Sequence, residues 1–129
     1  MTARLEHANI TVRDPGAMAR VLVDLFGWHI RWQGSAIHGG HTVHVGAEDS
    51  YLAVYTGPGD TPQAEAADSY VTRRGLNHLG VVVDDLEAVE NRVRTAGFLP
   101  RSHADYEPGK RFYFDGPEGI EFEVVSYAD

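Results

Sequence analysis

Two short segments of the chain repeat each other. Residues 5–14 match residues 76–85 at a constant offset of 71, and a histidine is the third residue of each copy. In both segments apolar residues alternate with residues that point to the opposite face, which predicts a β-strand. His7 and His78 are therefore expected on the same face of two equivalent strands.

The sequence after each of these strands predicts one helix and three further strands. Asp14 with Pro15 is a typical helix start, and Gly27 is a typical helix end. In the second copy, Asp84 is expected to open the helix, with Glu87 completing a capping box. The further strands are expected at residues 28–33, 41–45, 50–56, 98–102, 111–114 and 120–126.

This order predicts an α+β fold made of two βαβββ modules. The first module is expected to cover residues 1–56 and the second residues 76–129, with the polar, turn-rich residues 57–75 as a linker. A chain of 129 residues has the length of one modest domain. We therefore expect both modules to belong to a single domain, residues 1–129.

The last strands of the two modules correspond as well, at an offset of 70. The apolar residues on either side of Ala53 match those on either side of Glu123, so both of these residues are expected to face away from the apolar side of the sheet. His7, His78 and Glu123 thus occupy equivalent places in the repeat. The fourth equivalent place holds Ala53.

Two imidazoles and one carboxylate suggest a metal site. This ligand set suits divalent cations and leaves coordination positions open for water or substrate. The chain has no cysteine, so any metal must be held by His, Asp or Glu. The alternative is ordinary structure, because a histidine on a half-buried strand is more often a hydrogen-bonded structural residue and a lone glutamate is usually solvated.

The residues beside the candidate ligands could line a substrate cavity. Tyr51 and Tyr55 flank Ala53, and Glu121 flanks Glu123, all at the spacing that keeps them on one strand face. Ordinary strand packing is the alternative for the tyrosines. Glu121 could act as a base, against the alternative of a solvated residue at a strand edge.

Charge and hydropathy exclude two classes of partner. The formal net charge is −8, and there is no cluster of lysine and arginine to bind a phosphate backbone, so nucleic acid is not expected. No apolar run approaches the roughly 20 residues that span a bilayer, and no signal peptide opens the chain. The cytoplasm is the default expectation.

The chain resembles the vicinal oxygen chelate superfamily, which includes glyoxalase I, fosfomycin-resistance thiol transferases, bleomycin-resistance proteins and extradiol dioxygenases. The resemblance rests on the paired βαβββ modules, the histidine that opens each module, and the runs Phe112–Gly119 and Phe122–Val124. It covers essentially the whole chain. It implies an incompletely closed barrel, completed in a homodimer, in which one site can draw ligands from both subunits.

The resemblance also implies a divalent metal, Fe²⁺, Mn²⁺, Ni²⁺ or Zn²⁺, held by His7, His78 and Glu123. Glu123 is in addition the candidate catalytic residue. The chain departs from the family pattern at two places, which argue against glyoxalase I activity and against fosfomycin-resistance activity. Ala53 stands where glyoxalase I has a glutamate that serves as ligand and base, and the arginine expected shortly after the terminal glutamate of the fosfomycin enzymes is missing.

We therefore expect a small metal-dependent enzyme of the lyase, isomerase or dioxygenase type. Its substrate would be a compact oxygenated organic molecule bound at the metal. The alternative is a binding protein that sequesters a small molecule without catalysis, as bleomycin-resistance members do.

Overall fold

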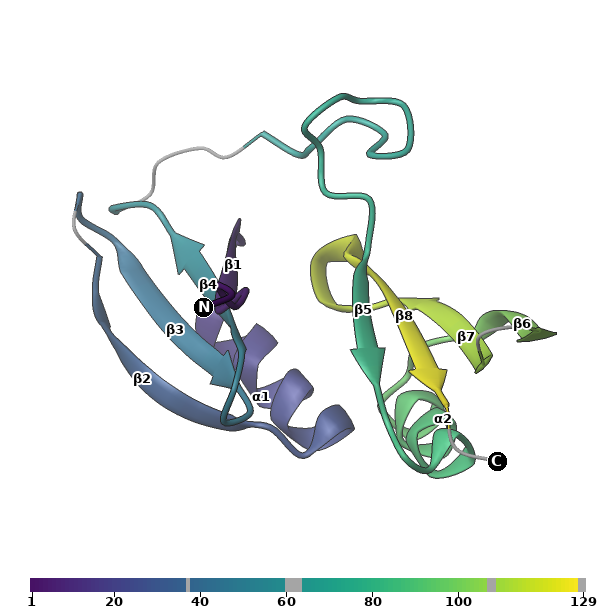
Figure 1. The fold of residues 1–129 in the computed structure, drawn as a ribbon. Coiled ribbons are helices and arrows are strands. Elements are labelled where there is room, and N and C mark those ends of the chain that lie inside the picture. Colours follow the sequence, from purple (N-terminus) through teal and green to yellow (C-terminus); the bar gives the residue numbers. More distant parts are fainter. Residues whose placement is uncertain (37, 60–63, 107–108, 128–129) are drawn as a thin grey trace. The chain divides into compact units, whose positions relative to one another are not determined.

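The computed structural model describes residues 1–36, 38–59, 64–106 and 109–127 (Figure 1). The chain divides into two compact units, Met1–Gln63 and Ala64–Asp129, here called unit 1 and unit 2. The division falls inside the predicted linker 57–75, of which residues 60–63 lie outside the described part. The single-domain organisation stays a prediction.

Unit 1 is a four-stranded sheet with one helix. Strand β1 runs parallel to β4, and the pairs β4 with β3 and β3 with β2 are antiparallel, which gives the order β1-β4-β3-β2. The elements are β1 (His7–Thr11), α1 (Pro15–Phe26), β2 (His29–Ser35), β3 (His41–Gly46) and β4 (Tyr51–Thr56).

Unit 2 repeats this arrangement, with the strand order β5-β8-β7-β6 and a parallel pair formed by β5 and β8. The elements are β5 (Leu79–Val82), α2 (Leu86–Thr95), β6 (Arg101–Tyr106), β7 (Gly109–Asp115), the 3₁₀ turn η1 (Pro117–Gly119) and β8 (Glu121–Ser126). The predicted α+β fold of two βαβββ modules is confirmed.

Each unit buries the apolar residues of its helix against one face of its sheet. In unit 1 the fully buried residues include Met18, Leu22 and Leu25 of α1 and Val43, Val45 and Val54 of the sheet. In unit 2 they include Val93 of α2 and Phe112, Phe114, Phe122 and Val124 of the sheet. Strand alternation turns the intervening residues of each sheet to the opposite face, which is where the candidate site residues lie.

The helix start at Asp14 is confirmed, whereas the second helix begins one residue later than predicted. Asp14 Oδ1 accepts a hydrogen bond from Ala17 N at 3.0 Å. In unit 2 the N-cap is Asp85, whose Oδ1 accepts from Ala88 N at 3.0 Å, so the predicted capping box of Asp84 with Glu87 is wrong. Asp84 is still tied to the sheet, because its carbonyl oxygen accepts from the Ser126 hydroxyl at 3.3 Å.

The strand predicted at residues 98–102 is also displaced, because β6 begins at Arg101. Phe98 belongs to the end of α2, where its N–H donates to Val93 O at 3.1 Å after Gly97 has taken a left-handed conformation with φ of 95°. The Phe98 ring packs against Phe114 at a centroid distance of 5.9 Å. Helix termination and core packing therefore use residues that looked like a strand.

Candidate functional site

The registers of the two parallel strand pairs agree with the sequence repeat. Asn9 of β1 lies opposite Ala53 of β4, and Gly80 of β5 lies opposite Glu123 of β8. Ala53 and Glu123 therefore occupy the same place in their sheets, as the offset of 70 predicts.

Unit 2 brings two of the three predicted ligands together. His78 immediately precedes β5, and its Nε2 lies 2.9 Å from Glu123 Oε1. Both side chains are largely buried, with 30% of His78 and 13% of Glu123 exposed. The imidazole and the carboxylate therefore share a partly dehydrated site.

The residue before each candidate histidine orients its ring. Asn77 Oδ1 lies 2.7 Å from His78 Nδ1, and Glu6 Oε1 lies 2.9 Å from His7 Nδ1. Oxygen acceptors at Nδ1 favour a proton on that nitrogen, which leaves Nε2 of each ring to accept a proton or bind a metal. In both modules the preceding residue thus orients the histidine ring.

Glu123 also forms an ion pair with an arginine. Arg111 Nη1 donates to Glu123 Oε2 at 2.7 Å, so both carboxylate oxygens have partners. The guanidinium is held in place by Gly109 O and by the Tyr106 ring, whose centroid is 4.9 Å from Arg111 Cζ. Burial by itself lowers the pKa of Arg111, but the hydrogen bond to Glu123 and its charge outweigh burial and raise that pKa.

Tyr113 lies directly opposite Glu123 in the β7–β8 pair. Its ring meets His78 edge-on at a centroid distance of 5.7 Å. Burial, followed by the charge of Glu123, raises the pKa of the Tyr113 hydroxyl, so this group stays protonated near neutral pH. Tyr113 therefore offers a hydrogen-bond donor beside the His78 and Glu123 pair.

Glu121, the predicted cavity residue and candidate base, has two donors of its own. Arg101 Nη2 donates to Glu121 Oε2 at 2.7 Å, and the Tyr70 hydroxyl donates to Glu121 Oε1. Partial burial raises the pKa of Glu121, but these hydrogen bonds outweigh it and the pKa is lowered. The hydrogen bond to Glu121 in turn raises the pKa of Tyr70 to about 12. The two donors hold Glu121 as an anion.

The remaining predicted residues lie in unit 1. The His7 ring stacks on Tyr51 at a centroid distance of 4.8 Å, and the Tyr51 hydroxyl donates to Glu6 at 3.3 Å. Ala53 is buried, with 1% of its surface exposed, and lies opposite His44 of β3. Tyr55, half-buried, lies opposite Thr11 of β1.

The structure adds residues that the sequence did not single out. Arg111 and Tyr113 contact Glu123, Tyr70 and Arg101 contact Glu121, and His44 faces Ala53 as Tyr113 faces Glu123. The sequence repeat alone does not match His44 with Tyr113. That match requires the registers of the β3–β4 and β7–β8 pairs. Burial lowers the pKa of His44, which favours the neutral imidazole.

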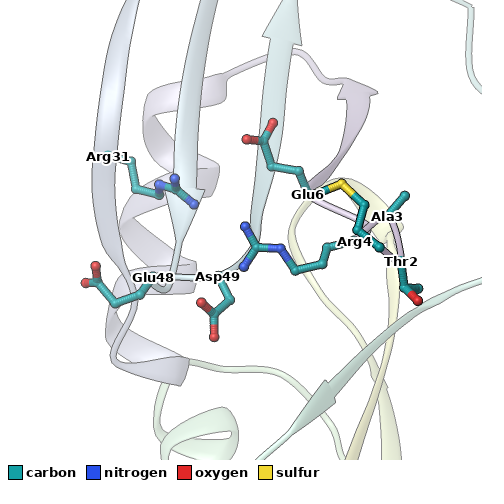
Figure 2. Close-up of a pocket in the computed structure, with 8 residues that line it drawn as sticks. Thr2, Ala3, Arg4, Glu6, Arg31, Glu48 and Asp49 are labelled. Carbon is teal, nitrogen blue, oxygen red and sulfur yellow. The ribbon is translucent and has the colours of Figure 1, made fainter.

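Unit 1 also contains a cavity of about 480 Å³ (Figure 2). It is lined by Met1, Thr2, Ala3, Arg4, Glu6, Arg31, Glu48 and Asp49, a mixture of two arginines and three acids. None of the three predicted metal ligands is among these lining residues, although the lining residue Glu6 is hydrogen-bonded to the His7 ring.

The spacing of His78 and Glu123 is suitable for two ligands of one divalent cation. Ligand atoms bound at about 2.0–2.2 Å to one metal lie roughly 3 Å apart, which agrees with the 2.9 Å between His78 Nε2 and Glu123 Oε1. Within the described parts of the chain, no group of three or more His, Cys, Asp or Glu residues is arranged to hold a metal. His7 belongs to the other unit, so the three-ligand site stays a prediction.

Comparisons with known proteins establish the family. The profile of the Glyoxalase/Bleomycin resistance protein/Dioxygenase superfamily matches residues 4–124, and the chain belongs to this superfamily. A search of curated proteins finds no match.

Solved structures of low sequence identity share the fold. A glyoxylase/bleomycin resistance protein/dioxygenase domain from Frankia sp. EAN1pec has a TM-score of 0.80 at 20% identity, with 98% of each chain covered. The fosfomycin resistance protein FosX from Mesorhizobium loti has a TM-score of 0.71 at 23% identity, covering 97% of this chain and 92% of that one. TnmS3, an antibiotic binding protein from Streptomyces sp. CB03234, has a TM-score of 0.72 at 16% identity, covering 97% and 96%.

In the part of the chain that the structure describes, none of the helices combines the length and the hydropathy needed to span a bilayer.

Proposed function

We propose that the protein is a metal-dependent enzyme of the glyoxalase superfamily that acts on a small oxygenated organic substrate. The proposed ligands are His7, His78 and Glu123, and the proposed metal is Fe²⁺, Mn²⁺, Ni²⁺ or Zn²⁺. The observation that carries the proposal is the environment of His78, whose two ring nitrogens both face oxygen acceptors, Asn77 Oδ1 at 2.7 Å and Glu123 Oε1 at 2.9 Å.

A neutral imidazole has one N–H, so it can donate to only one of these two acceptors. His78 and Glu123 would hold the proposed metal as two of its ligands, and with the Nε2 lone pair used in this way Nδ1–H could donate to Asn77 without conflict. The bound metal would supply Lewis acidity, polarising a substrate oxygen. The equivalent orientation of His7 by Glu6 supports His7 as the third ligand.

The chain's own residues suit a proton transfer or an oxygenation at such a site. Arg111 holds Glu123 Oε2, so Oε1 remains turned toward His78. Glutamate is missing at position 53, so a base of the glyoxalase I kind must come from elsewhere in the site. We further propose a homodimer, in which His7 of one subunit can join His78 and Glu123 of the other.

Metal analysis of protein purified without a histidine tag tests the proposal. We expect one divalent ion per site, lost after chelation and restored by Fe²⁺, Mn²⁺, Ni²⁺ or Zn²⁺. Separate His7→Ala, His78→Ala and Glu123→Gln variants should each fail to retain the metal, whereas His103→Ala, a matched surface histidine, should retain it. Wild-type protein that takes up none of these ions would contradict the proposal.

Mixing the His7→Ala and His78→Ala proteins tests the shared site. In a dimer whose sites combine ligands from both subunits, exchange of subunits leaves one intact set of three ligands, and metal binding should partly return. If each site lies within one chain, the mixture should bind no more metal than the separate variants.

A second candidate function is ligand sequestration without catalysis. The ion pair of Arg111 with Glu123 favours it, because a carboxylate already neutralised by an arginine can be a structural residue. The same fold in an antibiotic binding protein is consistent with this alternative. Tight binding of a small molecule by protein that takes up no metal would decide for it.

A further inference from the structure

The cavity of unit 1 collects charged side chains of both signs at one end of the sheet (Figure 2). Its walls come from the segment before β1, the start of β2 and the turn between β3 and β4, which the strand registers bring to the same end. The volume of about 480 Å³ lies within the range of roughly 300–1,000 Å³ that is typical of small-molecule sites. The charged lining residues are Arg4, Glu6, Arg31, Glu48 and Asp49.

Two contacts fix the guanidinium of Arg31 at the cavity wall. Its Nη1 donates to Ala47 O at 3.2 Å, and its Cζ lies 4.5 Å from the centroid of the Tyr51 ring. Arg31 falls at the irregularity between Ile30 and Trp32 in the β2–β3 register, and such a bulge redirects a side chain. A guanidinium has five N–H donors, so Arg31 keeps donors for a ligand after its hydrogen bond to Ala47.

The turn between β3 and β4 carries two carboxylates of the cavity wall, Glu48 and Asp49. Ala47 N donates to Ser50 O at 3.0 Å, which closes the turn. This close approach requires glycine at position 46, because a Cβ added to Gly46 would lie 2.4 Å from Ser50 O. The backbone of the turn therefore holds both acidic residues at the cavity.

The opposite charges around the cavity are not paired with one another. Within the described residues, neither Arg4, Arg31 nor Asp49 forms an ion pair. Glu48 has a contact of 3.9 Å with His29, and 90% of its side chain is exposed. Figure 2 shows the Arg4 and Arg31 side chains extending toward each other across the cavity, with Asp49 beside Arg4. Charges of both signs are thus available to a ligand.

We propose that this cavity binds a small zwitterion of the α-amino acid class, with one carboxylate and one ammonium group. The ligand carboxylate accepts charge-assisted hydrogen bonds from the guanidinium groups, and its ammonium group donates to the acidic side chains. An anion without an ammonium group is repelled by the three acids, and a cation without a carboxylate is repelled by the two arginines. This inference goes beyond the proposed function and does not require metal.

NMR titration of metal-free, untagged protein tests the site. The metal is removed with chelator and the chelator by dialysis, because α-amino acids themselves bind divalent ions. The probes are L-norleucine, hexanoate, which lacks the ammonium group, and pentylamine, which lacks the carboxylate. We expect norleucine to bind in a saturable manner, about tenfold more tightly than either of the other probes. Equal affinity for the three probes, or no saturable binding of norleucine, would overturn the proposal.

Charge-removing variants assign the two halves of the ligand. Arg4→Gln and Arg31→Gln should each weaken norleucine by about three- to tenfold, whereas Arg31→Lys keeps the charge and should lose less. Asp49→Asn should weaken norleucine but not hexanoate, because it removes an acceptor for the ammonium group alone. Arg20→Gln and Asp24→Asn, at exposed positions of α1 outside the cavity, are the controls and should leave both affinities unchanged.

Chemical shifts locate the binding independently of affinity. Norleucine should shift the backbone amide signals of residues 47–50 and the Nε–H signal of Arg31, which Arg31→Gln identifies by elimination. Shifts confined to other parts of the chain, or unchanged norleucine affinity in both glutamine variants, would overturn the assignment. Because these measurements use metal-free protein, their failure and the absence of metal binding are separate results.

Discussion

Arg111 donates to Glu123 Oε2 at 2.7 Å while His78 lies 2.9 Å from the other oxygen of the same carboxylate. One glutamate thus connects a fixed cation on β7 with the imidazole in front of β5. The arrangement orients Oε1 before any ligand arrives. This relationship makes Arg111 a candidate positioning residue for the proposed metal site.

We predict that Arg111→Met weakens metal binding by about tenfold or more, because Glu123 loses the partner that orients it. Metal titration followed by calorimetry measures the change. Arg94→Met, which removes an exposed arginine paired with Glu90 on α2, is the control and should leave metal affinity unchanged. Tighter metal binding by Arg111→Met would show instead that the guanidinium competes with the metal.

Asn77→Leu should also weaken metal binding, by about 10- to 100-fold, since His78 Nδ1 then lacks its acceptor and the ring is no longer oriented. Asn77→Asp keeps an oxygen at that place and should restore most of the affinity. Asn91→Leu on the surface of α2 controls for a general loss of stability. Equal metal affinity in Asn77→Leu and wild type would remove Asn77 from the site.

The N-cap of α2 is Asp85 and not the predicted Asp84, and two variants test this difference. Asp85→Ala should lower the free energy of unfolding by about 1 kcal/mol, because the Ala88 N–H loses its capping acceptor. Asp84→Ala removes the neighbouring carboxylate, which is not the cap, and should cost clearly less. Urea unfolding of both variants measures the difference, and a larger loss in Asp84→Ala would contradict the observed cap.

The contacts of Glu90 predict that the free energy of unfolding depends on pH. Partial burial raises its pKa, but hydrogen bonds from Arg94 and His103 outweigh burial and the pKa is lowered. A lowered folded-state pKa means that the stabilisation is present above the unfolded-state pKa and is lost as pH falls through the folded-state value. Glu90→Gln should therefore be less stable than wild type at pH 7, by roughly 0.5 kcal/mol, and nearly equal to it at strongly acidic pH.

Urea unfolding at both pH values checks this prediction, with Glu87→Gln, in the first turn of α2, as the control. A difference between Glu90→Gln and wild type that persists unchanged in acid would show that ionisation of Glu90 is not its source.

The sequence repeat was sufficient to predict the modules and one feature of the site. Periodicity and the offset predicted the βαβββ order and the equivalence of Ala53 with Glu123, because both follow from local alternation along a strand. The partners of Glu123 did not follow in the same way. Arg111 and Tyr113 reach Glu123 through the β7–β8 hairpin, and that register depends on the turn at Pro117–Gly119.

The missed strand and helix boundaries have a similar physical origin. Phe98 has strand propensity, but the hydrogen bond to Val93 and the contact with Phe114 place it at a helix end. Asp84 and Asp85 are adjacent, and either side chain could cap a helix. In the structure the Asp85 carboxylate accepts from Ala88 N, while the Asp84 carbonyl oxygen accepts from the Ser126 hydroxyl of the sheet. Choices of this kind depend on tertiary contacts.

The parallel pairing of β1 with β4 has a consequence for synthesis of the chain. His7 pairs with Tyr51, so the first strand finds its partner only after nearly all of unit 1 has left the ribosome. The hairpin of β3 with β4 has neighbours close in sequence and can form earlier. His7 therefore cannot join its sheet before β4 has been synthesised, and a nascent chain that stops before residue 51 lacks the strand with which β1 pairs.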